Sequence, residues 1–363
     1  MGEALIIKAG GDIYNKATGG GSSSGILQTE IFTESGTFIV PKARNQSFSV
    51  RIFGGGGAGY MFYDNNSLNS PTSGYVSGGG GGGGFMNNAI FNINQGELIP
   101  IIIGAGGLAT RKLIVNGGTT SFGTYLSALG GCSGDSGGYG GDGGSGGGGA
   151  KKGGTGYQFG GGGILANGSS SSTRAGNGGY WGGGGGIRVN NSNVTIGGVI
   201  YDEAYNDTSV NGISEYGGCG GSRNINAENG INTIGLNIDF EGEGLGGNNC
   251  GYNAGGGGYG GCGGNNGGGG GGYAANGGNN GGGGGGYGLG HGGDGYNSSS
   301  NYNHGAGGGG GSYGPGGSIG NPDGTFGGGG AGEYSYTSGS TINTYIPAGN
   351  GGNGICIIQY YLE

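Results

Sequence analysis

The chain contains two histidines, His291 and His304, and Asp294 lies between them. Two imidazoles and a carboxylate are ligands that zinc accepts in proteins. No pair of cysteines at the short spacing of a zinc site completes such a set, because the five cysteines are widely spaced. We therefore interpret these residues as parts of polar loops, and we expect no bound metal and no cofactor.

Catalytic arrangements are also missing from the sequence. Adjacent carboxylates, such as Asp202 with Glu203 or Glu241 with Glu243, fall in polar stretches, where solvated charges are a better interpretation than a glycosidase pair. Glycine fingerprints for nucleotide binding match by chance in such a chain, and none follows a strand and opens a helix. The sequence therefore favours a protein that is not an enzyme.

Tyrosine, asparagine and serine gather instead in polar stretches between glycine runs. This mixture is typical of antibody binding loops, because tyrosine offers a large contact area at low entropic cost and the small polar residues adapt their hydrogen bonds. The alternative is that the tyrosines only cover the edges of a glycine-rich body. We favour binding, and the candidate binding residues come from two such stretches: Tyr201, Tyr205, Tyr296, Asn297, Asn301 and Tyr302.

The composition excludes several classes of protein. Glycine accounts for 119 of the 363 residues, but long glycine runs and only 6 prolines are incompatible with the collagen repeat. Lysine and arginine total 12 against 20 aspartates and glutamates, which gives a net charge of -8, so we expect no nucleic-acid partner. The 23 tyrosines and 11 phenylalanines are too many for a solvated linker. We see no secretory leader and no run of about 18 apolar residues, and we expect no membrane insertion.

Short apolar or alternating stretches predict β-strands near the two ends of the chain. They fall at residues 31–32, 37–40, 48–53, 85–86 with 89–93, 98–103, 113–115, 119–122 and 125–129, and once more at 354–361. The C-terminal stretch has only the N-terminal strands as pairing partners. We therefore predict an attachment segment at 1–30, followed by a β-sandwich of residues 31–129 that is closed by a C-terminal strand within 353–363.

Residues 130–352 make up the remaining body, in which glycine runs alternate with polar loops. Glycine disfavours an α-helix by about 1 kcal/mol per position relative to alanine, and glycine strands have no side chains to bury. Polyproline II remains, with three residues per turn and no internal hydrogen bonds. Such left-handed glycine helices can pack side by side and bond through their outward N–H and C=O groups. We predict an all-β chain with a polyglycine II body and essentially no α-helix.

Three parts of the sequence resemble glycine-rich phage tail proteins. The first is FTESGTFIVP at 32–41 with SVRIFGGGGAG at 49–59, the second is GEL at 96–98 leading to IGAGG at 103–107, and the third is GGNGICIIQYY at 351–361. They bracket nearly the whole chain, whose middle matches only in composition. The body is also similar to the polyglycine-helix sandwich of tail-fibre tip adhesins, whose loops between helices select the receptor.

This resemblance implies a receptor-binding protein at the tail tip of a phage or of a phage-tail-like bacteriocin. Its partners would be a bacterial surface receptor, either a glycan or a surface-layer protein, and tail or baseplate proteins held through the N-terminal region. The habit of the family allows a homotrimer. The protein would be made in the host cytoplasm and act outside, at the host surface. A structural glycine-rich fibre or spacer without its own receptor specificity is the alternative.

Overall fold

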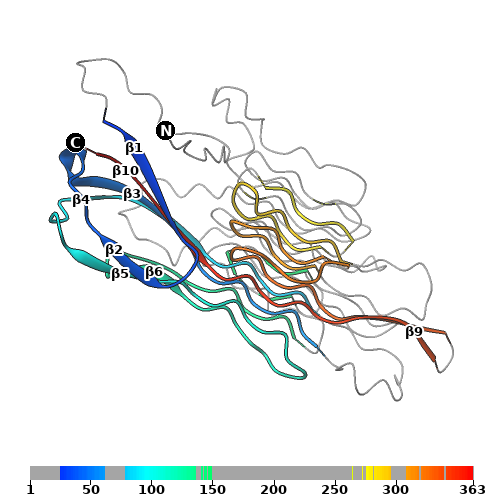
Figure 1. The fold of residues 1–363 in the computed structure, drawn as a ribbon. Helices are drawn as coiled ribbons and strands as arrows, with labels where there is room; N and C mark the ends of the chain where they lie inside the picture. Colours follow the sequence, from blue (N-terminus) through cyan, green and yellow to red (C-terminus); the bar gives the residue numbers. More distant parts are fainter. Residues whose placement is uncertain are drawn as a thin grey trace, which may run out of the picture.

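The computed structural model shows short β-strands joined to long glycine-rich segments (Figure 1). Among the described residues there is no α-helix, and one 3-10 turn, Arg44–Gln46, lies between two strands. The predicted all-β fold without α-helix is therefore confirmed. The structure describes residues 25–61, 78–135, 140–141, 143–144, 146–148, 264, 272, 275–280, 282–295, 308–318, 320–338 and 341–362.

The strands form two four-stranded antiparallel sheets and a separate hairpin. The first sheet has the order β1-β10-β3-β4, the second has the order β2-β5-β6-β7, and β8 pairs with β9. The strands are β1 Leu27–Phe32, β2 Gly36–Ile39, β3 Ser47–Phe53, β4 Phe85–Phe91, β5 Leu98–Ile102, β6 Thr120–Phe122, β7 Leu126–Ala128, β8 Tyr334–Ser338, β9 Thr341–Ile346 and β10 Ile355–Tyr361.

The C-terminal strand β10 lies inside the first sheet. Ile357 is opposite Ile31 of β1, and Ile358 is opposite Val50 of β3. The C-terminus therefore pairs with strands from the beginning of the chain, as the sequence predicted. The first strand begins at Leu27, within the stretch 1–30 that we expected to be only an attachment segment.

The structure differs from the predicted strands in two places. Residues 113–115 form no strand, because the N–H of Leu113 closes a turn onto the carbonyl of Thr110 at 3.1 Å. Conversely, the hairpin β8–β9 lies in the glycine-rich part, where no strand was expected. Its strands read YSYTS and TINTYI, and this tyrosine- and threonine-rich alternation is typical of strands.

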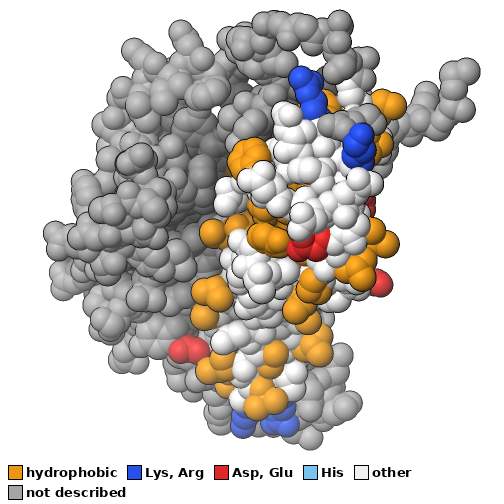
Figure 2. Space-filling view, turned by 90° about the vertical axis from the view of Figure 1, so that its left-hand side faces the viewer, with side chains coloured by type: hydrophobic (Ala, Val, Ile, Leu, Met, Phe, Trp, Pro, Cys, Tyr) orange, Lys and Arg blue, Asp and Glu red, His pale blue; other side chains and the backbone are white. Residues whose placement is uncertain are grey.

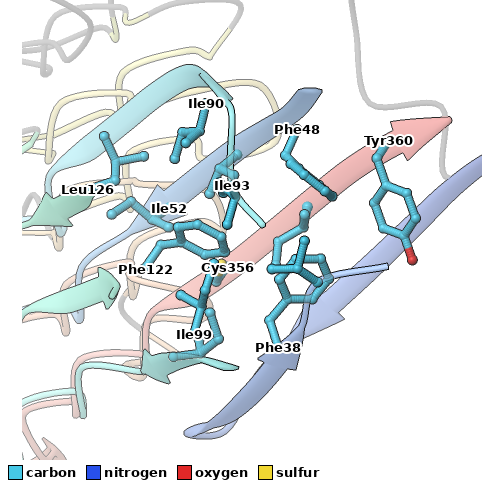
Figure 3. Packing of buried hydrophobic residues seen from close by; sticks show 14 of the residues in the cluster. Phe38, Phe48, Ile52, Ile90, Ile93, Ile99, Phe122, Leu126, Cys356 and Tyr360 are labelled. Atoms are coloured by element: carbon cyan, nitrogen blue, oxygen red, sulfur yellow. The ribbon is translucent and has the colours of Figure 1, made fainter. Parts of the chain in front are cut away.

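One core lies between the two sheets and combines side chains from both (Figure 3). The rings of Phe38 in β2 and Phe48 in β3 meet edge to face with centroids 5.8 Å apart, and Tyr360 of β10 lies 5.5 Å from Phe48. Side chains alternate between the faces of a strand, so Ile52 and Ile358 point into the same core. This core holds together the strands from which the glycine segments continue.

The glycine segments continue the strands without a change of register. In the first sheet Phe53 of β3 is opposite Phe85 of β4. Beyond this pair the backbones of 54–60 and 78–84 stay joined at every third residue, by N–H···O bonds of 2.9 to 3.1 Å from Gly54 to Gly84, from Gly57 to Gly81 and from Tyr60 to Gly78.

Residues 54–60 also bond to other segments at the positions between. Two further neighbours accept N–H groups, each at an interval of three: Gly55 and Ala58 donate to Gly118 and Val115, and Gly56 and Gly59 donate to Gly352 and Gly349. Three more neighbours donate to the carbonyl groups of the same segment, through Gly107, through Gly131 with Gly134, and through Gly330 with Glu333. A strand would present a period of two, whereas polyproline II has three residues per turn. The period of three supports the polyglycine II body, whose helical geometry itself stays a prediction.

Burial follows the same period where a segment lies at the surface. Ile101, Gly104 and Gly107 are buried, whereas the residues that follow each of them, Ile102, Ala105 and Leu108, are exposed. One of the three faces of this segment therefore points to solvent along its whole length.

At the glycine positions of 54–60 the packing of the segments leaves no room for a side chain. A Cβ added to Gly54 would overlap the carbonyl oxygen of Leu129, and one added to Gly59 would overlap that of Ala331. Only hydrogen on Cα lets two backbones approach so closely. Glycine is therefore required here by contact between segments, not by an unusual φ angle.

A second apolar cluster ties the more distant glycine segments to the other face of the first sheet. Phe53, Phe85 and Ile357 of the sheet pack with Tyr287 and Tyr313 of the glycine-rich body. The rings of Phe85 and Tyr287 are stacked, with centroids 4.5 Å apart. Aromatic side chains thus join the sheet to the body at its side, while backbone hydrogen bonds join them end to end.

Candidate binding surface at the ends of the glycine segments

The six predicted binding residues, Tyr201, Tyr205, Tyr296, Asn297, Asn301 and Tyr302, lie outside the described residues. Their role in binding stays a prediction. The second histidine, His304, also lies outside them.

His291 and Asp294 are described, and both join neighbouring glycine-rich segments. Nδ1 of His291 accepts the backbone N–H of Asn276 at 2.9 Å, and Oδ1 of Asp294 accepts that of Asn279 at 2.7 Å. Within the part of the chain that the structure describes, no three His, Cys, Asp or Glu side chains lie together in a way that could hold a metal ion. In this arrangement the two side chains act as acceptors for backbone groups.

The glycine segments attached to the strands extend toward one end of the molecule, which we call the distal end (Figure 1), whereas the turns that carry Tyr287 and Tyr313 lie beside the first sheet. The segments that follow β3, β5 and β7 run away from the sheets, and those that precede β4, β6 and β10 return to them. The hairpin β8–β9 starts at the same end, because the N–H of Glu333 donates to the carbonyl of Tyr60 at 3.3 Å. The described parts of the distal end are Met61, the hairpin, and residues 108–114, which we call the distal loop.

The distal loop exposes large apolar side chains next to positive charges. Leu108, Leu113 and Ile114 are 65%, 55% and 63% exposed. Arg111 and Lys112 lie between them and are exposed as well. Figure 2 shows this combination, with basic and hydrophobic side chains side by side at the lower end of the described face.

Hydrogen bonds hold the distal loop in one conformation. The N–H of Lys112 donates to the carbonyl of Met61 at 2.8 Å, and the N–H of Ala109 donates to Oδ1 of Asn350 at 2.8 Å. Just before the loop, Oδ1 of Asn353 accepts the N–H of Gly106 at 2.9 Å. The loop is therefore attached to two neighbouring segments, and its side chains project from a fixed backbone.

Lys112 has a φ angle of 56°, in the left-handed region. This region is uncommon for residues other than glycine, asparagine and aspartate. A lysine held there by its neighbours costs free energy, and such positions cluster at sites of function. The distal loop therefore combines strain, exposure and charge in one short segment.

The structure describes two of the cysteines, Cys132 and Cys356. Cys356 is fully buried in the core, and burial raises the pKa of its thiol to about 12, so that the thiol stays protonated at neutral pH. Cys132 is exposed.

A second exposed apolar surface lies on the outer face of the second sheet. Ile39 of β2 is opposite Leu98 of β5, and both are 64% exposed, while Ile102 further along β5 is 54% exposed. At the end of this sheet away from the glycine segments, the hydroxyl of Tyr125 donates to Oε1 of Glu97 at 3.0 Å, which raises the pKa of Tyr125. This face carries apolar side chains, and the exposed Lys42 and Arg44 follow β2 in the chain.

Sequence reasoning did not select the distal loop, because its last two residues, Leu113 and Ile114, fall in a stretch whose pattern predicts a strand. The signal that could have identified it is the order of residues, LATRKLIV, in which two cations interrupt an apolar stretch between two glycine segments.

Comparisons with known proteins add no relative to this picture. No known protein family has a model that matches the chain, and no curated protein has a similar sequence. In the described part of the chain, no helix has the length and apolar character needed to cross a membrane.

Proposed function

We propose that the protein is a non-enzymatic adhesin that recognises a bacterial surface receptor, at the tip of a phage tail or of a phage-tail-like bacteriocin. The observation that carries the proposal is the common distal end, where the distal loop and the hairpin β8–β9 are presented together by hydrogen-bonded glycine segments that are rooted in the two sheets. Binding loops need such a rigid scaffold, because ordering them on contact would cost affinity.

The choice of a tail protein rests on the sequence resemblance at residues 32–59, 96–107 and 351–361. In this proposal the loops between glycine segments contact the receptor, and the N-terminal region contacts tail or baseplate proteins. The receptor is a glycan or a surface-layer protein. The glycine lattice alone would also suit a spacer, which is the second function that the structure supports.

Binding of the purified full-length protein to whole bacterial envelopes separates these two functions. The double substitution Tyr296→Ala with Tyr302→Ala should lower envelope binding about tenfold or more, which corresponds to about 1.4 kcal/mol per decade. Few aromatic residues dominate most binding surfaces. Thermal stability should stay unchanged if these residues serve only binding.

A matched control removes two exposed tyrosines of the sheet region. Tyr125, in the turn between β6 and β7, and Tyr361 of β10 are 44% and 42% exposed; changing both to alanine should leave envelope binding intact. A spacer would bind no envelopes in its wild-type form. Loss of binding only on changes to exposed residues of the strands β1–β7 and β10 would instead make the sheets the binding head. Stripping the envelopes of protein or of glycan then identifies the class of receptor.

A further inference from the structure

The outward side chains of the second sheet, all four of whose strands lie in the described part of the chain, carry no charge. They alternate along the strands with core residues such as Phe38, Ile99 and Phe122. The outward residues are Thr37, Ile39, Leu98, Pro100, Ile102, Ser121 and Ser127. Lys42 and Glu97 lie beyond the ends of β2 and β5, at the margin of this face. An apolar centre with charges at its margin is typical of a protein interface.

The apolar part of this face extends beyond the strands along the glycine segments. In β5 every second residue from Leu98 to Ile102 is exposed. Beyond β5 the exposed positions come every third residue, at Ala105 and Leu108, and Leu108 is 65% exposed. Leu129, which follows β7, is 58% exposed. No charged residue occurs from Leu98 to Leu108, so the uncharged face continues from the sheet onto the glycine body.

The first sheet shows how this chain covers an apolar sheet face. On its outer side Phe53, Phe85 and Ile357 are buried, and they pack against Tyr287 and Tyr313 of the glycine-rich body. No described residue covers the second sheet in this way, because its large outward side chains stay exposed. A contiguous exposed apolar surface usually marks a site of interaction.

The size of the face suits a partner of protein size. Four strands about 4.8 Å apart are about 19 Å wide, and the backbone from Leu98 to Leu108 extends about 30 Å at a rise of about 3.2 Å per residue. The flat area is therefore about 600 Å², against about 800 Å² of accessible surface that each partner contributes to a standard interface. Accessible surface exceeds its flat projection, so the face reaches the size that a stable dimer needs.

We propose that this face packs against the same face of a second copy of the chain, so that the two second sheets lie face to face about a two-fold axis. Each chain has a net charge of -8, and the repulsion between two copies is least where the facing surfaces carry no charge. A different protein that recognised this acidic chain would be expected to offer positive charges, and the outward residues of the face include no carboxylate to receive them. Equal faces paired about a two-fold axis are the commonest arrangement of soluble homo-oligomers.

This pairing does not depend on the proposed function, because it uses the side of the molecule that the second sheet forms. It also differs from the homotrimer that the sequence resemblance allows. Two flat faces that cover each other leave no place for a third copy on the same surface, so the assembly closes at two chains.

Sedimentation equilibrium of the full-length protein tests the pairing directly. Between about 1 and about 100 μM the mass should rise to twice the 34.6 kDa of one chain, since interfaces near the standard size have dissociation constants of micromolar or lower. At 1 M salt the mass should stay doubled, because no charged pair lies at the centre of the contact and the Debye length is then about 3 Å.

Two variants weaken the contact in different ways. Ile39→Thr with Leu98→Thr removes two apolar side chains that lie opposite each other, and threonine keeps a side chain that suits a strand; the dissociation constant should rise about tenfold or more. Ser127→Asp adds a carboxylate at an exposed position of β7 and removes no apolar side chain. Its dissociation constant should also rise about tenfold or more, because equal charges then meet across the two-fold axis.

Matched controls make the same kinds of change on other surfaces. Leu27→Thr with Ile31→Thr removes two apolar side chains of 48% and 46% exposure from β1 of the first sheet. Asn321→Asp adds a carboxylate at an exposed position of the glycine-rich body. Both controls should pair like the wild type.

Thermal melting identifies any variant that fails to fold. If Ile39→Thr with Leu98→Thr melts early, Ser127→Asp decides the test, because position 127 is exposed and lies outside the core. A wild-type protein that stays a single chain at about 100 μM, a mass of three chains, or controls that pair as weakly as the face variants would overturn the inference.

Discussion

Replacement of Gly56 by alanine tests whether the glycine body depends on direct contact between backbones. Gly56 is buried, and a Cβ at this position would overlap the carbonyl group of Gly328 and lie 2.7 Å from the carbonyl oxygen of Gly327. The two segments must move apart by about 1 Å to reach an ordinary carbon–oxygen separation. The nearest bond between them, from the N–H of Gly330 to the carbonyl of Gly57, is 2.9 Å long and would break.

The expected cost follows from the groups that this movement leaves without partners. One buried N–H and one buried carbonyl lose their bond, at about 1–3 kcal/mol each. Alanine recovers less than about 1 kcal/mol through the smaller entropy of the unfolded chain. We therefore expect Gly56→Ala to lower the free energy of unfolding by about 2–5 kcal/mol, a large part of the 5–15 kcal/mol that is typical of a folded domain.

Guanidinium unfolding followed by circular dichroism measures this difference against two controls. Gly36→Ala adds the same methyl group to the exposed strand β2, where the nearest atoms are those of the Phe32 ring at 3.6 Å, and should change stability by less than about 0.5 kcal/mol. Gly96→Ala meets no atom within 4 Å but has a φ of 81°, so it measures backbone strain without overlap. If Gly56→Ala unfolds at the same midpoint as Gly36→Ala, contact between backbones does not hold the body together.

Three further predictions concern the sheets. Burial and donation of its hydroxyl to Oε1 of Glu30 at 2.6 Å raise the pKa of Tyr360. The contribution of this hydroxyl to the free energy of unfolding is therefore complete below about pH 10 and is lost as the pH rises through the higher pKa of the folded state. Tyr360→Phe should lower the free energy of unfolding by about 1 kcal/mol at neutral pH and flatten the alkaline loss of stability. Alkylation of the native protein at pH 8, followed by peptide mapping, should label the exposed Cys132 and leave the buried Cys356 unmodified until the protein unfolds. A chain that ends before β10 loses a strand from the interior of the first sheet and should aggregate, whereas a soluble product with unchanged melting would contradict its central place.

The sequence predicted the two sheets well because the alternation of apolar and polar residues in their strands can be read from it. Alternation in Phe48, Val50 and Ile52 identified β3, and the apolar end of the chain had only the N-terminal strands as partners, which the register of β10 confirms. The same rule failed at residues 113–115, where Leu113 and Ile114 are exposed directly after a turn. Propensity alone does not distinguish a buried strand from a loop that presents apolar side chains to a partner.

The glycine body could be predicted as a class of structure but not as an arrangement. A run of glycines has no side chains, so nothing in its sequence states which segment will be its neighbour. The neighbours of 54–60 are set elsewhere, by the pairing of β3 with β4 and β10, and each segment continues the register of the strand from which it comes. The pairing of the strands therefore decides which glycine segments become neighbours, and the glycine segments continue that pairing.

The way in which the two sheets approach each other explains where the glycine segments must begin. Sheets packed through side chains lie about 10 Å apart, and residues such as Phe48 and Phe122 fill this space in the core. One residue beyond the end of β3, Gly54 already approaches the backbone of Leu129, which follows β7 of the opposite sheet, and the N–H of Gly55 bonds to Gly118, which precedes β6. The two layers therefore converge as soon as their side chains end, and each backbone gains neighbours from both.

The close approach of the backbones determines which residues can vary at the distal end. Many contacts between the described glycine segments are made by backbone groups, so a change of exposed turn side chains that bond to no neighbouring segment should not disturb the packing of the body. The turns meet a different constraint, since each must join two segments whose positions are already fixed. Lys112 shows how strongly that constraint acts, because its backbone adopts a left-handed φ while its side chain stays exposed. A body built in this way can carry new residues at its tip without repacking a core, which is the property that a surface for recognising changing bacterial envelopes requires.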